Sequence, residues 1–155
     1  MKEGEHVTSP EDAELITRFE MQKCTPDILI TNYSMLEYML LRPREKNIWD
    51  DTTKWLHSDV QNKILFIIDE AHMYRGAAGG EVALLIRRLF HKLHIDRKQA
   101  QFILTTASMP SGEAEDKAVM KFACDLTAAE DSSHICYLKG ERAELIQMDA
   151  KNIPF

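Results

Sequence analysis

Three short runs of apolar residues predict the strands of the protein. Residues 28–30, Ile64–Ile68 and residues 102–104 contain only isoleucine, leucine and phenylalanine. Such runs lack the alternation of a half-exposed strand, so they predict strands that are covered on both faces of a sheet. A fourth apolar stretch, residues 135–138, is a candidate for a last strand.

Other patterns predict helices between these runs. Apolar side chains recur at steps of three and four from Val82 to Leu93, which is the clearest helical stripe in the chain. Ser9 and Pro10 are typical of a helix start, and the helix that they begin is expected to end near Gln22. Ser34 has capping-box spacing to a glutamate and predicts the start of a second helix.

The segments between these elements look irregular. Residues 43–63 are mostly polar and predict a loop with at most one helical turn near Trp55. Three glycines in residues 76–80 predict a flexible loop before the long helix. Residues 110–112 predict a turn, which leads into a further helix over residues 113–124.

Strands that alternate with helices predict an α/β fold with a parallel sheet flanked by helices. The three best strands are followed by polar pairs, namely Thr31-Asn32, Asp69-Glu70 and Thr105-Thr106. The carboxyl ends of parallel strands share one edge of the sheet, and ligands of open α/β folds bind at that edge. These polar residues are therefore candidates for one functional site.

Asp69-Glu70-Ala71-His72 is the strongest candidate for chemistry. Two neighbouring acids at a strand end suit nucleotide hydrolysis because they can divide two tasks between them. One carboxylate can hold hydrated Mg²⁺ against the phosphates, and the other can orient and deprotonate the attacking water. The position directly after a buried strand makes the motif far more specific than its four letters.

The segment from Ile67 to His72 resembles motif II of superfamily 2 helicases. The resemblance implies a RecA-like domain of the P-loop NTPase type, with ATP and Mg²⁺ as cofactors. By that resemblance Asp69 binds Mg²⁺ through water and Glu70 is the catalytic base. His72 would link the ATP site to the nucleic-acid site.

Three further segments resemble other parts of these helicases. Thr105, Thr106 and Ser108 lie in a Thr-Thr-Ala-Ser sequence that resembles motif III, whose usual form is Ser-Ala-Thr. Thr31 and Asn32 end a segment that resembles motif Ib, so these residues and Ser34 are expected to contact nucleic acid. Tyr74-Arg75-Gly76 is similar to bacterial DEAH-box DNA helicases, which implies DNA as the partner and Arg75 as a further contact.

The sequence lacks a phosphate-binding loop. Gly-Lys-Thr and Gly-Lys-Ser occur nowhere in the 155 residues, although P-loop motors need this lysine to grip the phosphates. We therefore expect residues 1–155 to be one domain, the C-terminal part of the first RecA-like domain without its P-loop strand. The P-loop segment and the second RecA-like domain would belong to a larger parent motor, and the isolated chain would neither hydrolyse ATP usefully nor unwind a duplex.

Composition adds limits to this interpretation. The net charge of −6 argues against a globally basic nucleic-acid binder, although a local patch can still grip phosphate. The longest apolar runs are far too short to cross a bilayer, and three widely spaced cysteines form no disulfide or zinc pattern, so the expected setting is the cytoplasm. Two alternatives stay open: a non-catalytic nucleic-acid or protein-binding adaptor derived from a motor, and another nucleotide hydrolase with an acid pair after a strand.

Overall fold

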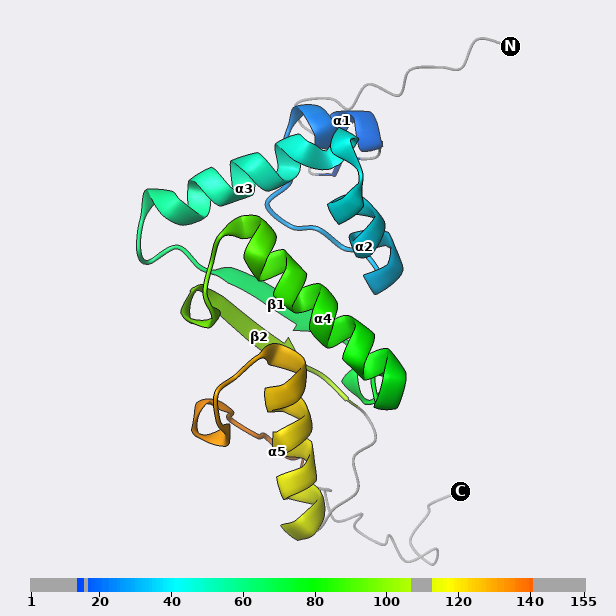
Figure 1. Ribbon diagram of the computed structural model, residues 1–155, viewed down its shortest axis with the longest axis vertical. Helices are drawn as coiled ribbons and strands as arrows, with labels where there is room; N and C mark the ends of the chain where they lie inside the picture. The colour runs from blue at the N-terminus through cyan, green and yellow to red at the C-terminus, as the bar shows by residue number, and fades with distance from the viewer. Residues whose placement is uncertain (1–13, 16, 107–112, 141–155) are drawn as a thin grey trace, which may run out of the picture.

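A computed structural model describes residues 14–15, 17–106 and 113–140 of the protein. These residues form an α/β arrangement in which helices pack beside a two-stranded parallel sheet (Figure 1). In chain order its helices and strands are α1 (Arg18–Lys23), α2 (Tyr33–Leu41), α3 (Lys46–Ser58), β1 (Ile64–Ile68), α4 (Gly76–Leu93), β2 (Ala100–Leu104) and α5 (Glu113–Thr127). Within the described residues, no helix combines the length and the apolar character that a bilayer crossing needs.

The two strands pair in parallel, and α4 connects them. The register places Ile64 opposite Ala100 and Ile68 opposite Leu104, so both strands end at the same level. This arrangement confirms the predicted parallel sheet with helices, as in a partial RecA-like domain. The residues that follow β1 and β2 are consequently neighbours at one edge of the sheet.

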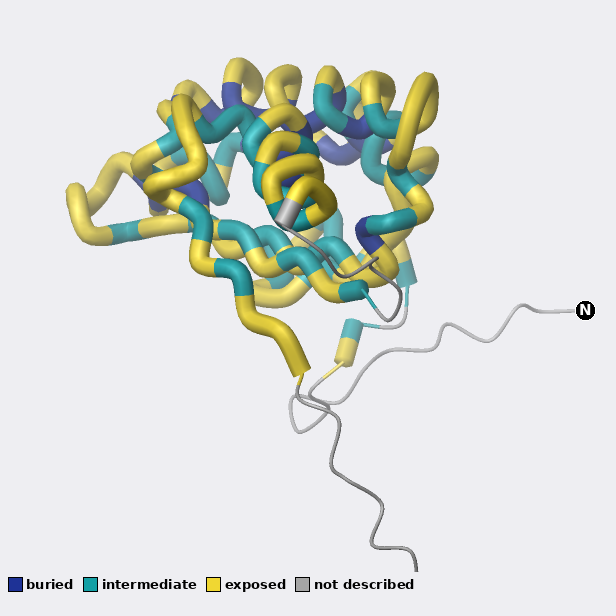
Figure 2. Tube along the Cα trace, turned by 90° about the horizontal axis from the view of Figure 1, so that it is seen from below, coloured by how far each residue is buried: buried dark blue, intermediate teal, exposed yellow. Residues whose placement is uncertain are grey.

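The expectation that the strands are covered on both faces is wrong for the described residues. Phe66 and Ile68 pack against the core, whereas Leu65 and Ile67 keep 50% and 64% of their surface exposed. Ile103 of β2 is 48% exposed on the same pattern of alternation. Figure 2 shows the buried residues gathered among the helices on one side of the strands, which explains the difference between the two faces.

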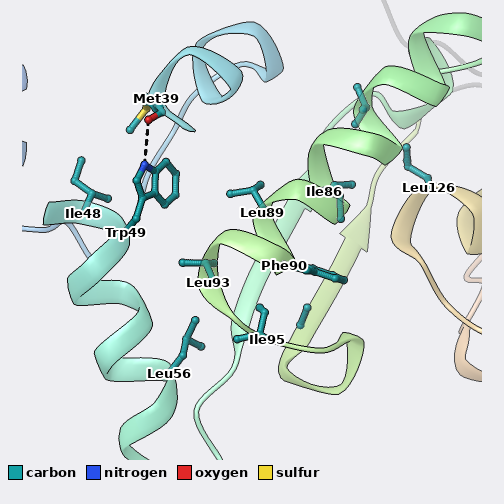
Figure 3. Close-up of a cluster of buried hydrophobic side chains, with 12 residues drawn as sticks. Met39, Ile48, Trp49, Leu56, Ile86, Leu89, Phe90, Leu93, Ile95 and Leu126 are labelled. Carbon is teal, nitrogen blue, oxygen red and sulfur yellow. Dashed lines mark hydrogen bonds between the residues drawn. The ribbon is translucent and has the colours of Figure 1, made fainter. Parts of the chain in front are cut away.

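The core lies where α3 and α4 pack beside the sheet (Figure 3). The stripe predicted from Val82 to Leu93 is buried, as expected for the inward face of a helix. Phe66 and Phe102 stack with ring centroids 4.9 Å apart, which joins the covered faces of the two strands. Leu56 of α3 and Leu93 of α4 are fully buried.

Residues 43–63 are helical over much of their length, so the prediction of an irregular segment is wrong. Helix α3 occupies Lys46–Ser58 and buries Ile48, Trp49 and Leu56. These three side chains lie on one face of a helix, although polar residues separate them in the sequence. The indole Nε1 of Trp49 donates a hydrogen bond of 3.0 Å to the carbonyl of Met39 and holds α3 against α2.

The predicted glycine loop is also wrong, because α4 begins at Gly76 and contains all three glycines. Gly79 faces the backbone of Tyr74, and a Cβ at this position would lie 2.3 Å from the Tyr74 carbonyl oxygen. Glycine is therefore required here by close approach of two backbone segments. Gly80 has no such neighbour within 4 Å.

Residues 28–30 do not form the predicted strand. Ile28 and Ile30 are 80% and 94% exposed, whereas Leu29 between them packs against the core. A strand requires a neighbour for its backbone hydrogen bonds, and within the described residues β1 pairs with β2 alone. Residues 135–138 likewise form no strand, and Leu138 is 84% exposed.

The predicted helix boundaries are partly confirmed. Helix α2 is capped by Asn32, whose side chain accepts a hydrogen bond from the amide of Met35 at 2.8 Å, so the cap is not Ser34. Helix α5 confirms the helix expected after residue 112, although it continues to Thr127. Helix α1 has its own capping box at Thr17 and ends at Lys23. The predicted start at Ser9 and the turn at residues 110–112 lie outside the described residues.

Candidate active site

Asp69 follows the last residue of β1 and is held by two donors. Its Oδ1 atom accepts a hydrogen bond from the backbone amide of Glu70 at 3.0 Å and another from the hydroxyl of Thr105. Thr105 follows the last residue of β2, so this contact joins the ends of the two strands. Among the described residues no donor reaches Oδ2 of Asp69, which leaves one oxygen of the oriented, exposed carboxylate for a ligand.

Glu70 occupies a strained backbone conformation. Its φ and ψ angles of 49° and 44° lie in the left-handed region, which is uncommon for residues other than glycine. This conformation reverses the chain directly after β1 and starts a 3-10 turn over Ala71–Met73. Non-glycine residues in such conformations cluster at functional sites, where the surrounding structure holds them in place.

His72 lies between an acid and a hydroxyl. Its Nδ1 atom is 3.1 Å from Oε2 of Glu70 and 3.1 Å from the hydroxyl oxygen of Thr106. An ionised carboxylate only accepts hydrogen bonds, so Nδ1 carries the proton when it bonds Glu70. The Glu70 side chain remains 52% exposed, and its carboxylate can still meet solvent or a ligand.

Backbone hydrogen bonds fix the turn that carries these side chains. The amide of Thr105 donates to the carbonyl of Ile68 at 3.0 Å, and the amide of Ala71 donates to the carbonyl of Thr105 at 2.8 Å. The sheet ladder therefore continues past the ends of the strands. Because Ala71 is also buried, the Asp69–His72 turn is anchored to the end of β2 rather than loose in solvent.

The residues proposed to contact nucleic acid lie on two segments that an aromatic contact joins. Thr31, Asn32 and Ser34 are exposed at the start of α2, and Arg75 is exposed at the start of α4. Tyr33 and Tyr74 meet edge to face with their ring centroids 6.1 Å apart. This contact places the start of α2 beside the segment that follows His72. Ser108, the remaining predicted site residue, lies outside the described residues.

The donor set suits a hydrated divalent cation. Within the part of the chain that the structure describes, no group of three or more histidine, cysteine, aspartate or glutamate side chains is arranged to hold a metal. Mg²⁺ in nucleotide sites keeps several waters and needs only one or two carboxylates together with substrate phosphates. Asp69, with one oxygen available, meets this requirement, whereas a closed structural metal site would not form here.

Comparisons with known proteins agree with this geometry. The fold class is a partial RecA-like α/β domain, and its acid pair follows β1. The model of the DEAD/DEAH box helicase family matches residues 4–116. This match covers well over half of the chain, so the protein belongs to the DEAD/DEAH box helicase family.

Two relatives are considerably longer than the chain. It is 55% identical over 127 residues to Druantia protein DruE of Escherichia coli, a match that covers 82% of the chain and 7% of DruE. It is 28% identical over 98 residues to an uncharacterized ATP-dependent helicase of Methanocaldococcus jannaschii, covering 63% of the chain and 13% of that protein. No solved structure matches the chain.

The sequence patterns did not indicate two features of the site. The contact between Tyr33 and Tyr74 joins residues far apart in the chain, and neither tyrosine belongs to an apolar period that would mark it. The only available signal was their position beside the candidate residues Asn32 and Arg75. The second feature, the left-handed conformation of Glu70, has no signal in a glutamate side chain.

Proposed function

We propose that the chain is the DEAH-carrying part of an ATP-dependent nucleic-acid motor. One observation carries this proposal: the acid pair Asp69-Glu70 follows β1, and the Thr105 hydroxyl at the end of β2 donates a hydrogen bond to Asp69. In this account residues 1–155 are the C-terminal part of a first RecA-like domain. The P-loop segment and the second RecA-like domain are contributed by other parts of a longer motor.

The proposed role of Asp69 is to hold Mg²⁺ through water. The Thr105 hydroxyl and the Glu70 amide both bond Oδ1, which fixes the plane of the carboxylate and orients Oδ2. When bound, ATP would supply the phosphoryl group, and Mg²⁺ would neutralise the charge of the phosphates. Because the carboxylate is oriented in advance, it loses little freedom when a hydrated cation arrives.

The proposed role of Glu70 is to accept the proton of the attacking water. Its half-exposed carboxylate can receive that proton at one oxygen while Oε2 stays beside His72. His72 contacts both the Glu70 carboxylate and the Thr106 hydroxyl, so a change in the charge of Glu70 can alter its contact with the segment after β2. We assign the coupling between hydrolysis and nucleic-acid binding to His72, Thr105, Thr106 and Ser108.

The proposed nucleic-acid surface consists of Thr31, Asn32, Ser34 and Arg75, with DNA as the partner. Support comes from the Tyr33–Tyr74 contact, which brings the two segments that carry these residues together. Hydroxyl and amide groups beside an arginine are common contacts to phosphate and sugar. A cytoplasmic setting is proposed because all three cysteines are free thiols.

A phosphate-release assay tests the proposal. The isolated chain should show no magnesium-dependent turnover of ATP because it lacks the Gly-Lys-[Ser/Thr] sequence. The proposed longer motor that contains this chain, called the complete protein below, should show it. Turnover by the isolated chain would contradict the assignment as part of a motor. Absence of turnover in the complete protein would favour the alternative, a nucleic-acid or protein-binding adaptor derived from a motor domain.

A further inference from the structure

We propose that Tyr33 is a stacking platform for a base of single-stranded nucleic acid and that Tyr74 supports it. This inference rests on the proposed function and adds a mode of recognition to it. Tyr33 is 40% exposed although its ring contacts that of Tyr74, with an interplanar angle of 83°. The contact with Tyr74 therefore leaves part of the Tyr33 side chain accessible to a third aromatic group.

The Tyr33 ring is held in place on both sides of the contact. Its backbone starts α2 directly after the Asn32 cap, whose side chain bonds the amide of Met35. On the other side, the amide of Tyr74 donates to the carbonyl of Ala71 at 3.0 Å, and Gly79 packs closely against the Tyr74 carbonyl. A platform restrained in this way loses little conformational freedom when a base stacks on it.

Stacking also fits the charge of the chain. The net charge is −6, and the cations placed near Tyr33 are few: Arg75 follows Tyr74, and the Arg18 guanidinium lies 2.8 Å from the sulfur of Met35. A surface with so few cations neutralises few phosphates, so its affinity must come mainly from contacts other than counterion release. Stacking of a base on an aromatic side chain supplies such a contact and tolerates any base sequence.

The position of Tyr74 connects this platform with the Asp69–His72 turn, which we call the DEAH turn. Tyr74 closes the 3-10 turn of Ala71–Met73, and the amide of Ala71 bonds the end of β2. Tyr74 is two residues from His72, so the Tyr33 platform lies beside the turn that carries the acid pair.

Fluorescence anisotropy of the 155-residue chain can separate stacking from backbone binding. The probes are a labelled oligothymidylate and a labelled abasic deoxyribose-phosphate strand of the same length. We expect the wild-type chain to prefer oligothymidylate by about fivefold or more, the effect of one stacked base. The Tyr33→Phe variant should keep this preference, and Tyr33→Leu should lose it.

Tyr38→Leu is the matched control. Tyr38 lies on the same helix with 55% exposure, and its ring contacts Arg42 rather than Tyr74. This variant should keep the wild-type preference. Equal binding of both strands by the wild type would overturn the stacking role while leaving a backbone-binding surface intact. Failure to bind either strand would overturn both the platform and the proposed nucleic-acid surface, and preference retained by a folded Tyr33→Leu variant would overturn the platform alone.

Discussion

The hydroxyl oxygen of Thr106 lies 3.1 Å from Nδ1 of His72, which joins the segment after β2 to the DEAH turn. Replacing Thr106 by valine removes the hydroxyl and keeps the branched shape. In the complete protein we expect nucleic-acid stimulation of ATP hydrolysis to fall about fivefold or more, the effect of about 1 kcal/mol. The basal rate should change less, because Glu70 and Asp69 remain.

Thr53→Val is a suitable control for this prediction. The Thr53 hydroxyl bonds the Trp49 carbonyl within its own helix at 2.7 Å, far from the DEAH turn in sequence and fold. Stimulation should be unchanged in this variant. Equal stimulation of Thr106→Val and wild-type protein would show that the bond to His72 does not couple the two sites.

Replacement by alanine should change the free energy of unfolding in opposite directions at Gly79 and Gly80. A Cβ at Gly79 would meet the Tyr74 carbonyl oxygen at 2.3 Å, so Gly79→Ala should lower the free energy of unfolding by about 1 to 3 kcal/mol. Gly80→Ala meets nothing within 4 Å and should raise it by about 0.5 to 1 kcal/mol, because alanine favours the helix. Urea unfolding of both variants measures the difference, and equal effects would contradict the close approach.

The indole of Trp49 donates a hydrogen bond to the Met39 carbonyl near the C-terminal end of α2. The residue four positions after Met39 is Pro43, which has no amide hydrogen to complete the helix ladder. The Trp49 indole supplies the donor instead, so Trp49→Phe should cost about 1 to 3 kcal/mol of unfolding free energy. Trp55→Phe, at a 53% exposed site, should change it by less than about 0.5 kcal/mol. Similar midpoints of urea unfolding for both variants would argue against this role.

The exposed face of the sheet should make the isolated chain associate. Leu65, Ile67 and Ile103 leave apolar surface uncovered among the described residues, and contiguous apolar surface favours aggregation. Light scattering should show species larger than a monomer, and Ile67→Lys should shift the chain towards a monomer. Leu138→Lys adds the same charge outside the strands and should shift it less. A monodisperse wild-type monomer would contradict this prediction.

Elements with a strong local signal could be predicted from the sequence. Ile64–Ile68 is a continuous apolar run, and Val82 to Leu93 repeats at helical steps, so β1 and most of α4 matched their patterns. Residues 28–30 have a similar local signal but have no paired neighbour among the residues that the structure describes, and a strand depends on that neighbour. Helix α3 was not predicted because its three buried side chains are separated by polar residues and form no clear apolar repeat in the sequence.

The site was predictable to the extent that topology determines it. Parallel strands bring their carboxyl ends together, so the meeting of Asp69 with Thr105 followed from the order of strands and helices. The capping role of Asn32 was not predicted, since a helix start can shift by two residues without changing the apolar pattern. The Tyr33–Tyr74 contact depends on how α2 packs beside the DEAH turn, which no local pattern encodes.

Phosphate release by the complete protein, compared between Glu70→Gln and Glu81→Gln, tests the central claim most directly. Both variants replace an exposed glutamate by its amide, but Glu81 lies on α4 outside the acid pair. If Glu70 accepts the proton of the attacking water, Glu70→Gln should lower kcat by about 100-fold or more, while Glu81→Gln should hydrolyse ATP at the wild-type rate. Equal magnesium-dependent rates for the two variants would contradict the assignment of Glu70 as the base that accepts this proton.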